Sequence, residues 1–251
     1  MAAIPLIRRS ALHAFHLAEA SMIEDHGWQC ADSYGAVDAE VQALREQVGL
    51  SDISPLAKLD IQGNDVFASL GQKLSLGLSL GISLETVPVG RAVRIPAQAL
   101  QLDAQASGLL CSLARNHARL ISPPGTAGAV HARVESVIQQ TADSACIHLT
   151  DVTSNFTAVQ IVGPLSRELL RKLTALDLRS AQFPDLSCAQ GSLASIHALV
   201  LRADIQAHLA YQVYCGREFG AYVWDALLDA GQEFGALPFG LAAQRQLQAQ
   251  G

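Results

Sequence analysis

The sequence has few lysines and no concentration of positive charge. Its 251 residues include fourteen arginines and three lysines, spread singly along the chain, and the formal net charge is -6. Proteins that bind nucleic acid present clustered basic residues, because these neutralise the phosphates. A nucleic-acid partner is therefore not expected.

Long apolar runs are also missing. A membrane-spanning helix needs about 20 consecutive apolar residues, and the longest runs here are well short of that length. The amino-terminal stretch MAAIPLIRRSALHAFH lacks the short apolar core of a signal peptide. We therefore expect a cytoplasmic protein that does not associate with a membrane.

Cysteine is present, but in no pattern that builds a crosslink or a metal site. The five cysteines are Cys30, Cys111, Cys146, Cys188 and Cys215. Their odd number, wide spacing and lack of a Cys-x-x-Cys pair argue against a disulfide framework and against a zinc site. We interpret them as reduced thiols in the core and predict no metal.

Two other patterns carry little weight. His13 and His16 are three residues apart on an expected helix but have no clear third ligand, so we expect surface or half-buried histidines. Residues 77–81 match G-x-S-x-G, the nucleophile turn of one hydrolase class. That turn works only between a strand and a helix, whereas this stretch lies in a run of Leu, Ser and Gly that indicates a loop.

The sequence does contain one segment in two versions. Residues 58–70 read KLDIQGNDVFASL and residues 158–170 read AVQIVGPLSRELL, an offset of 100 residues. Each runs from alternating apolar letters to a glycine, Gly63 or Gly163, and then into a helix rich in leucine. Glycine is expected there because a sharp turn from strand to helix makes a Cβ costly.

The pattern around this segment also repeats. Before the first copy, helices are expected over residues 13–23 and 40–48. The first copy then predicts strands over 57–62, 92–95, 100–102, 109–113 and 118–121 and a helix from 129; the second predicts strands over 159–162, 193–202 and 210–214, with helices after Pro164 and Gly216. We predict an α+β fold built from a duplicated unit. Residues 1–145 would hold the amino-terminal helices and the first lobe, and residues 146–251 the second.

Four segments together resemble the glycine cleavage T-protein (aminomethyltransferase) family, whose relatives include subunits of sarcosine oxidase. They are GWQCADSYGAVDAEVQALREQVGLSDISPLAKLDIQGND, TAVQIVGPLSRELLRKL, AYQVYCGREFGAYVWDALLDAGQEFG and LPFGLAAQRQL. The likeness covers nearly all of the chain from about Pro5. It implies two ferredoxin-like lobes of the T-protein folate-binding fold, forming one compact domain. The β-barrel that follows GLAAQRQL in full-length members is not in this sequence.

The resemblance implies a reaction in which a one-carbon unit passes from an aminomethyl group to tetrahydrofolate. In the family, a pair of Asp residues after a Gly lies near the reacting centre, where a carboxylate stabilises positive charge. The matching stretch begins at Gly108 and places Cys111 and Ser112 where the acids belong. Neither side chain is an anion at neutral pH without special help. The catalytic residues are therefore unknown.

The residues expected to hold the pterin ring are also replaced. Gln212 stands in the place of a family Glu that follows the aromatic Tyr211, and His208 in that of a preceding acid. An amide offers one acceptor and one donor, so it cannot accept two bonds as a carboxylate does. Gln244 replaces a family Arg, and Arg245, about 100° further round a helix, is expected to point elsewhere. The ligand-binding candidates are Leu56, Ser112, His208, Tyr211, Gln212 and Gln244.

These substitutions favour a non-catalytic binding or subunit protein, similar to the short γ subunit of sarcosine oxidase, that binds tetrahydrofolate or a folate-like ligand. The alternative is an active tetrahydrofolate-dependent aminomethyltransferase in which Cys111, Ser112, His208 and Gln212 supply the polar roles. In a third arrangement, a partner subunit or a second copy of the chain fills the place of the barrel.

Overall fold

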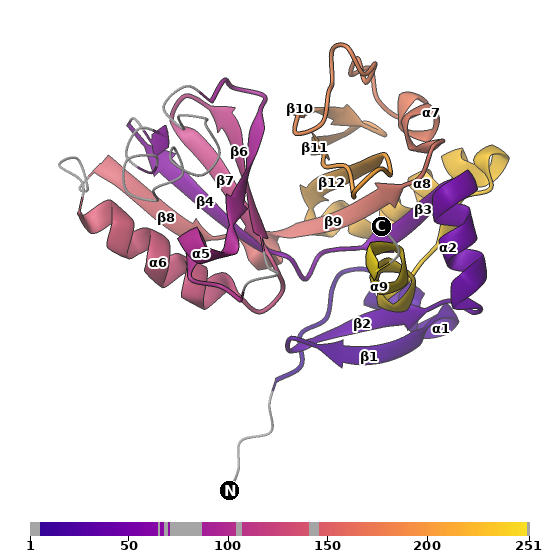
Figure 1. Ribbon diagram of the computed structural model, residues 1–251. Helices are drawn as coiled ribbons and strands as arrows, with labels where there is room; N and C mark the ends of the chain where they lie inside the picture. The colour runs from indigo at the N-terminus through magenta and orange to yellow at the C-terminus, as the bar shows by residue number, and fades with distance from the viewer. Residues whose placement is uncertain are drawn as a thin grey trace, which may run out of the picture. The chain divides into compact units, whose positions relative to one another are not determined.

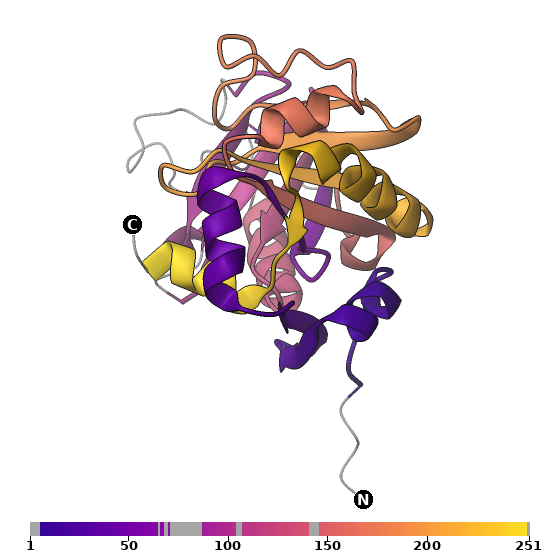
Figure 2. The same ribbon diagram turned by 90° about the vertical axis from the view of Figure 1, so that its right-hand side faces the viewer.

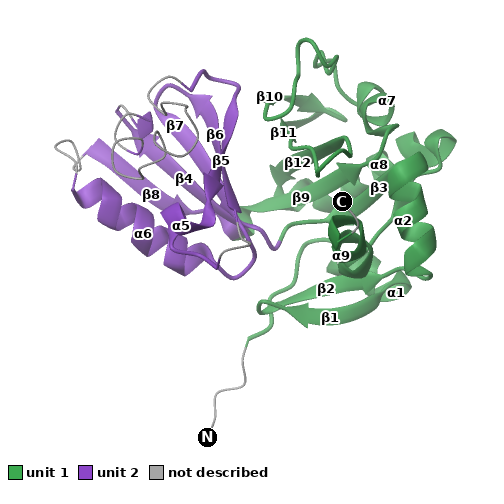
Figure 3. Ribbon diagram, in the orientation of Figure 1, with its two compact units in different colours: residues 1–54, 154–251 green, residues 55–153 purple. Residues whose placement is uncertain are grey.

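The computed structural model describes residues 6–64, 66, 67, 70, 87–103, 107–140 and 146–249. The chain divides into two compact units (Figure 3), unit 1 formed by residues 1–54 and 154–251 and unit 2 by residues 55–153. The α+β class is confirmed. The grouping differs from the expected division after residue 145, because the strand formed by Gly49–Asp52 pairs with the strand formed by Phe156–Val162.

Unit 2 is an antiparallel sheet with helices on one face (Figure 1). Its strands are β4 (Ala57–Gly63), β5 (Ala92–Pro96), β6 (Ser107–Ala114), β7 (His117–Ser122) and β8 (Ile147–Asp151), in the order β5-β6-β7-β4-β8. Its helices include α5 (Ala97–Leu100) and α6 (Ala127–Gln139). The i, i+4, i+7 and i+8 spacing predicted the buried face of α6 correctly: Val130, Val134, Val137 and Ile138 all lie in the core of this unit.

Unit 1 has a larger sheet in the order β10-β11-β12-β9-β3-β13. The strands are β3 (Gly49–Asp52), β9 (Phe156–Val162), β10 (Cys188–Leu193), β11 (Ile196–Arg202), β12 (Ala210–Gly216) and β13 (Leu237–Pro238). Helices α7 (Ser166–Arg171) and α8 (Gly220–Gly231) cover one face (Figure 2), and their leucines, Val223 and Trp224 share a core with strand residues such as Ile161 and Val213.

The opposite face of this sheet is covered at one end by α2 (Val37–Glu46) and α9 (Leu241–Ala249). Their side chains pack on Val162 and Ala210. Because side chains alternate along a strand, these two residues face away from Ile161 and Tyr211 in the first core. Helix α1 (His13–Glu19), the hairpin of β1 (Ser21–Asp25) and β2 (Trp28–Ser33), and the 3-10 turns Arg217–Phe219 and Gln232–Phe234 also belong to unit 1. Another 3-10 turn, Thr153–Asn155, spans the boundary between the units in the chain.

Each of the two sheets includes a strand that, in the chain, directly precedes a central strand of the other sheet. Strand β3 runs directly into β4 but pairs with β9, and β8 runs directly into β9 but pairs with β4. The register repeats as well, since Ile61 lies opposite Leu149 and Ile161 lies opposite Leu50. This reciprocal pairing places unit 2 as an insertion between two neighbouring strands of unit 1.

The corners where the chain leaves one unit for the other have the same hydrogen bonds. The N–H of Ser54 donates to Asp52 Oδ1 at 2.9 Å, and the N–H of Thr153 donates to Asp151 Oδ1 at 2.8 Å. The hydroxyl of Ser54 accepts from the N–H of Ala158 at 3.0 Å, as that of Thr153 does from the N–H of Lys58 at 3.1 Å. The duplication inferred from the sequence therefore extends to side-chain detail.

The two repeated glycines are required by close backbone packing. A Cβ at Gly63 would lie 2.2 Å from the carbonyl oxygen of Cys146, and one at Gly163 would lie 2.4 Å from that of Gln47. The expected need for glycine is confirmed. Glycine is required both by the turn and by the backbone of a neighbouring chain segment, which leaves no space for a Cβ.

Several expected elements were wrong. The predicted helix 13–23 ends at Glu19, because the left-handed turn at His26 and Gly27 pairs β1 with β2. The predicted strand 100–102 is instead the end of α5 and a following turn. The predicted strand 193–202 is interrupted by a left-handed turn at Ala194 and Ser195, which separates β10 from β11. Strands β3 and β8 were not foreseen, and the predictions for residues 77–81 lie outside the described residues.

Candidate functional site

The structure separates Cys111 and Ser112, the two residues that we expected at the acid positions. Ser112 lies on the same face of β6 as Leu110 and is paired with Ala118, and both neighbours belong to the core of unit 2. Cys111 is the next residue, so its side chain lies on the opposite face. Both are buried, with 0% and 1% of their surface exposed for Cys111 and Ser112. They do not form one polar pair.

A carboxylate that was not among the sequence candidates lies on the face of Cys111. Across the sheet, Cys111 is paired with Arg119 and Arg119 with Asp60. Arg119 donates from Nε to Asp60 Oδ1 at 2.7 Å and from Nη2 to Oδ2 at 2.9 Å, and His117 Nε2 lies 3.2 Å from Oδ2. A bidentate guanidinium engages both carboxylate oxygens through charge-assisted hydrogen bonds. Asp60 is thus held by a counter-ion.

Leu56 contributes its backbone to a buried lysine. The Nζ of Lys58, a residue with 0% exposure, donates to the carbonyl oxygens of Leu56 at 2.8 Å and Thr153 at 3.4 Å. A buried ammonium needs such acceptors to offset its lost hydration. The sequence candidate Leu56 therefore acts through its carbonyl group, at the corner where β4 begins.

In unit 1, Tyr211 and Gln212 lie on opposite faces of β12. Tyr211 is fully buried in the core beneath α7 and α8, stacked on Phe183 with ring centroids 6.4 Å apart. Burial raises the pKa of this phenol. Gln212 points to the other side, so the structure does not bring these two candidates together.

Gln212 has an unforeseen neighbour in Gln160. The two residues are direct partners in the pairing of β12 with β9, and Ser51 follows in the same row. Gln212 is 7% exposed and accepts from the hydroxyl of Tyr214 at 2.5 Å. Gln160 is 4% exposed, and its Oε1 has no donor among the residues that the structure describes. The sequence signal that could have identified Gln160 is a polar residue between two apolar residues in a central strand.

The remaining candidates lie at the α9 end of the same face. His208 is half-buried in a turn closed by mutual backbone bonds with Ile205, and the next turn residue, Gln206, donates to the carbonyl of Gln248 on α9 at 2.9 Å. Gln244 is half-buried on α9. Arg245 lies 3.6 Å from Asp25 and 3.5 Å from Asp32. It points to the β1–β2 hairpin, as the rotation of one helical residue predicts.

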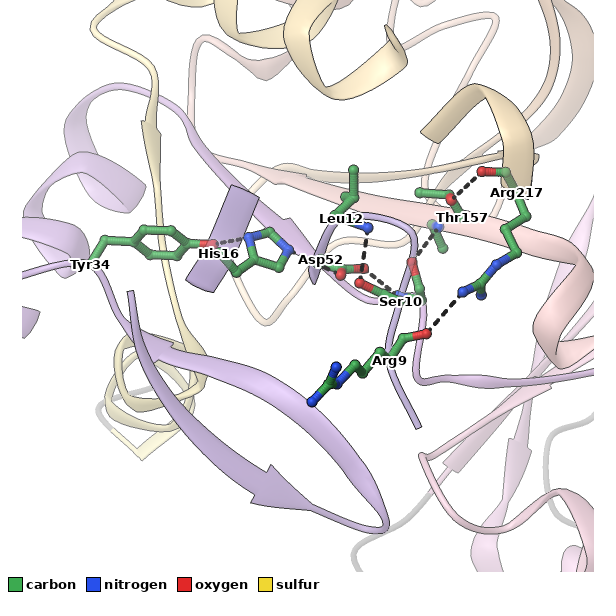
Figure 4. A network of polar contacts seen from close by, with 10 residues as sticks. Arg9, Ser10, Leu12, His16, Tyr34, Asp52, Thr157 and Arg217 are labelled. Carbon is green, nitrogen blue, oxygen red and sulfur yellow. Dashed lines mark hydrogen bonds and ion pairs between the residues drawn. The ribbon is translucent and has the colours of Figure 1, made fainter. Parts of the chain in front are cut away.

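A buried polar network joins α1, Tyr34 just after β2, and β3 (Figure 4). Tyr34 contacts His16 Nδ1 through its hydroxyl at 2.6 Å, and His16 Nε2 lies 3.1 Å from Asp52 Oδ2. His16 is 2% exposed and meets the edge of Trp224. The expectation of a surface or half-buried His16 was wrong, because two partners distant in sequence satisfy both ring nitrogens.

The electrostatics of this network favour a structural role. Burial raises the pKa of Tyr34, and so do the charges of Asp52, Glu19 and Glu40, so the phenol stays protonated. Burial alone would raise the pKa of Asp52, but hydrogen bonds from His16, Ser10 and Ser54 outweigh it and lower that pKa. Tyr34 also lines a cavity of about 200 Å³ beside α2 and β13. A protonated phenol there can orient its neighbours but is not a nucleophile.

The thiols and possible metal ligands show no further constellation. None of the five cysteines forms a disulfide, and three of them are buried, but Cys146 is exposed and Cys30 half-buried, so not all are core thiols. Burial raises the pKa of Cys30 to about 12 and that of Cys215 to about 11. Within the described parts of the chain, no group of three or more His, Cys, Asp or Glu side chains could hold a metal ion. Of the helices described, none is long and apolar enough to cross a membrane.

Comparison with protein families identifies a model that matches most of the chain. The model described as the GCVT N-terminal domain matches residues 12–250. The sarcosine oxidase subunit alpha of Corynebacterium sp. (strain P-1) is 30% identical over 254 residues, covering 97% of this chain and 26% of that protein. The aminomethyltransferase of Geobacillus sp. (strain WCH70) is 25% identical over 244 residues, covering 96% of this chain and 64% of that protein. The chain thus spans less than two thirds of either relative.

Solved structures show the same fold. The glycine cleavage system aminomethyltransferase T of Bartonella henselae superposes with a TM-score of 0.77 at 16% identity, covering 96% of this chain and 62% of the other. A chain of the heterotetrameric sarcosine oxidase of Corynebacterium sp. U-96, solved with pyrrole 2-carboxylate, gives a TM-score of 0.61 at 17% identity. That match covers 91% of this chain and 97% of the other.

Proposed function

Because the chain belongs to the family of GCVT N-terminal domains, we propose that it is a folate-binding-type protein whose active site has lost its catalytic charges. Its role is that of a non-catalytic binding or subunit protein of the cytoplasm, and its ligand is tetrahydrofolate or a folate-like molecule. The observation that carries the proposal is Asp60. This carboxylate lies on the face of Cys111, and both of its oxygens are bound by Arg119.

The loss of charge argues against fast aminomethyl transfer. Positive charge that develops on the folate nitrogens needs a carboxylate free to face it, and removing one such stabiliser typically costs about 10²–10³ in rate. Both oxygens of Asp60 are already bound by Arg119, and the neighbouring Cys111 is a buried thiol. Gln212 offers an amide in place of a carboxylate. We infer that the scaffold has been kept for binding.

A subunit role is supported by the relatives. The name of the related sarcosine oxidase subunit alpha says that it is one subunit of a larger enzyme. The sarcosine oxidase structure of similar fold is heterotetrameric. The chain also matches 97% of one chain in that assembly. We propose that this protein binds a partner subunit or a second copy of itself.

The alternative function is that of an active tetrahydrofolate-dependent aminomethyltransferase. It is favoured by the likeness to the Geobacillus aminomethyltransferase over 96% of this chain. In that case the polar roles would fall to Cys111, Ser112, His208 and Gln212. Ser112 is buried on the core face of β6, which argues against a catalytic role for its hydroxyl group.

Two measurements on the purified protein separate these functions. The first is calorimetric titration with 5-formyltetrahydrofolate, for which we expect saturable binding. The second is an assay of methylene transfer to tetrahydrofolate from a small methylamine donor, for which we expect no turnover above the uncatalysed rate. Turnover abolished by Gln212→Ala would establish the enzyme, and an absence of binding at millimolar ligand would overturn the proposed function.

A further inference from the structure

We propose that a second copy of this chain pairs with β8 of unit 2, so that the sheets of the two copies join edge to edge in antiparallel fashion. This pairing deepens the subunit role proposed above and rests on it, because it names both the partner and the surface that the partner covers. Strand β8 lies at one edge of the unit 2 sheet, beside α6 (Figure 1), and β4 is its one strand neighbour among the described residues.

The outer side of β8 presents backbone groups that no strand pairs with. The N–H of Val152 donates to the carbonyl of Lys58 at 2.9 Å, and such bonds recur at every second residue of an antiparallel pair. The N–H and C=O groups of Ile147, Leu149 and Asp151 therefore point away from β4. In the part of the chain that the structure describes, no further strand lies on that side. An added extended backbone is the partner that satisfies such a row of groups.

Strand β8 also lacks the features that keep other sheet edges from pairing. Edges are commonly protected by charged residues, by proline or by a covering segment. Strand β5, at the opposite edge of the same sheet, carries the exposed Arg94 and ends at Pro96. In unit 1, the edge strand β10 is partly covered by Thr174, whose hydroxyl donates to the carbonyl of Ser192 at 2.7 Å. Strand β8, with the sequence IHLTD, contains no Lys, Arg or Pro and pairs with β4 without a bulge.

A hollow of about 410 Å³ follows this edge. Its lining consists of residues 147–150 of β8 and, from α6, His131, Glu135, Ile138 and Gln139. Successive residues of a strand point to opposite faces of the sheet. Because four successive residues line the hollow, it lies along the edge of the sheet and not over one face. An added strand would run there, about 4.8 Å from β8.

The hydrogen-bonding pattern of β8 is complementary to itself. In an antiparallel pair centred on Leu149, this residue lies opposite Leu149 of the second copy, and Ile147 lies opposite Asp151 of the second copy. Residues that face each other in this way exchange two bonds, so the three outward residues of each copy form about six main-chain hydrogen bonds. Both copies satisfy their outer groups in the same contact. The two-fold symmetry of the row is the reason to choose a second copy as the occupant.

The side chains also agree with this register. On the exposed face, His148 would lie opposite Thr150 of the second copy, and an imidazole can bond to a hydroxyl group. On the α6 face, the half-buried Leu149 of each copy would meet its counterpart. Asp151 of the second copy would lie beside Gln139, whose amide can donate to the carboxylate.

Sedimentation velocity over a range of protein concentrations tests the pairing. We expect the mass of the wild-type protein to approach twice the 26.6 kDa of the chain as the concentration rises. The double substitution His148→Lys and Thr150→Lys should weaken association about tenfold, because like charges directly opposite each other destabilise a strand pair. The double substitution His148→Glu and Thr150→Lys places opposite charges there and should associate at least as tightly as wild type.

The matched control adds the same two positive charges to another exposed strand pair. Gln190→Lys combined with His197→Lys lies on β10 and β11 of unit 1 and should leave association unchanged. Amide hydrogen exchange of the wild-type protein supplies a second reading, which decides the matter if a β8 variant fails to fold. The amides of Leu149 and Asp151 should become protected as the concentration rises, whereas the amide of Val152 is protected throughout by its bond to β4.

The outcomes separate this pairing from the proposed function. A protein that stays monomeric at every concentration refutes it and leaves the β8 edge to a different chain. A dimer with equal affinity in both β8 variants, or with unprotected Leu149 and Asp151 amides, refutes it as well. The same samples are titrated with 5-formyltetrahydrofolate by calorimetry. A monomer that binds this compound refutes only the self-pairing, whereas an absence of binding at millimolar ligand overturns the proposed function whatever the mass.

Discussion

Single residues decide how much chemistry this scaffold retains. Asp60 lies in one cross-strand row with Arg119 and Cys111, and Arg119 binds both of its oxygens. Buried pairs of this kind are costly to break, because removal of one partner leaves an uncompensated charge. The charge of Asp60 thus serves the sheet of unit 2.

The Asp52 carboxylate should make stability depend on acid pH. Its pKa is lower in the folded protein than in the unfolded chain, so its contribution is complete above the unfolded pKa and is lost as the pH falls through the folded pKa. We expect Asp52→Asn to reduce the free energy of unfolding at pH 7 by about 1–3 kcal/mol, since it weakens the bonds to His16 and Ser54. The difference from wild type should shrink on acidification.

Urea denaturation at pH 7, 3.5 and 2.5 measures this effect, because the loss begins only below the unfolded pKa of 3.8. The exposed Asp225→Asn on α8 is the control and should follow wild type at every pH. A constant difference between Asp52→Asn and wild type across this range would mean that the lost stability does not come from the ionised carboxylate.

At the scale of elements, the repeated glycines make a sharp prediction. A Cβ at Gly163 would meet the carbonyl of Gln47, which is itself held by the N–H of Leu165 at 3.1 Å. We expect Gly163→Ala to destabilise the protein by about 1–3 kcal/mol through backbone strain. Gly128→Ala has open space in the first turn of α6 and should stabilise it by about 0.5–1 kcal/mol. Chemical denaturation of both variants compares them, and an equal effect would exclude close packing as the reason for Gly163.

The sequence predicted elements where periodicity was strong. Helix α6 and strands β4 and β9 were found because their apolar residues recur at helical or alternating spacing. The β10–β11 turn was missed because Ala194 and Ser195 occupy positions where a tight hairpin turn usually has Asn or Gly. Strand β3 was missed because four residues are too few to show alternation, and its place in the sheet depends on pairing with β9.

The candidate site was predictable only in part, for a similar reason. Sequence position identified Gln212. It could not show that Tyr211 points into the core on the other face of the sheet, or that Gln160 is the cross-strand partner of Gln212. Such relations depend on strand register between segments about 50 residues apart. Burial of an unpaired amide oxygen is visible only in three dimensions.

At the scale of the whole molecule, the reciprocal strand pairing makes unit 2 a continuous insertion. Residues 55–153 contain all five strands of their own sheet and the entire core that α6 covers. The insertion leaves and returns at neighbouring strands, where Ser54 and Ile53 both bond to Ala158. Unit 1 is discontinuous, because β3 precedes the insertion and β9 follows it.

A fragment of residues 55–153 should therefore fold alone. We expect a cooperative thermal transition with an unfolding enthalpy of about 70 kcal/mol near 60 °C, from about 0.7 kcal/mol per residue. A fragment of residues 1–145 is the control: it ends before β8 and lacks β9, so β4 and β3 each lose a strand partner. Calorimetry and circular dichroism should show a lower midpoint or no transition for that fragment. If it were the more stable of the two, the pairing of β3 with β9 and β8 with β4 would not be what defines the folding units.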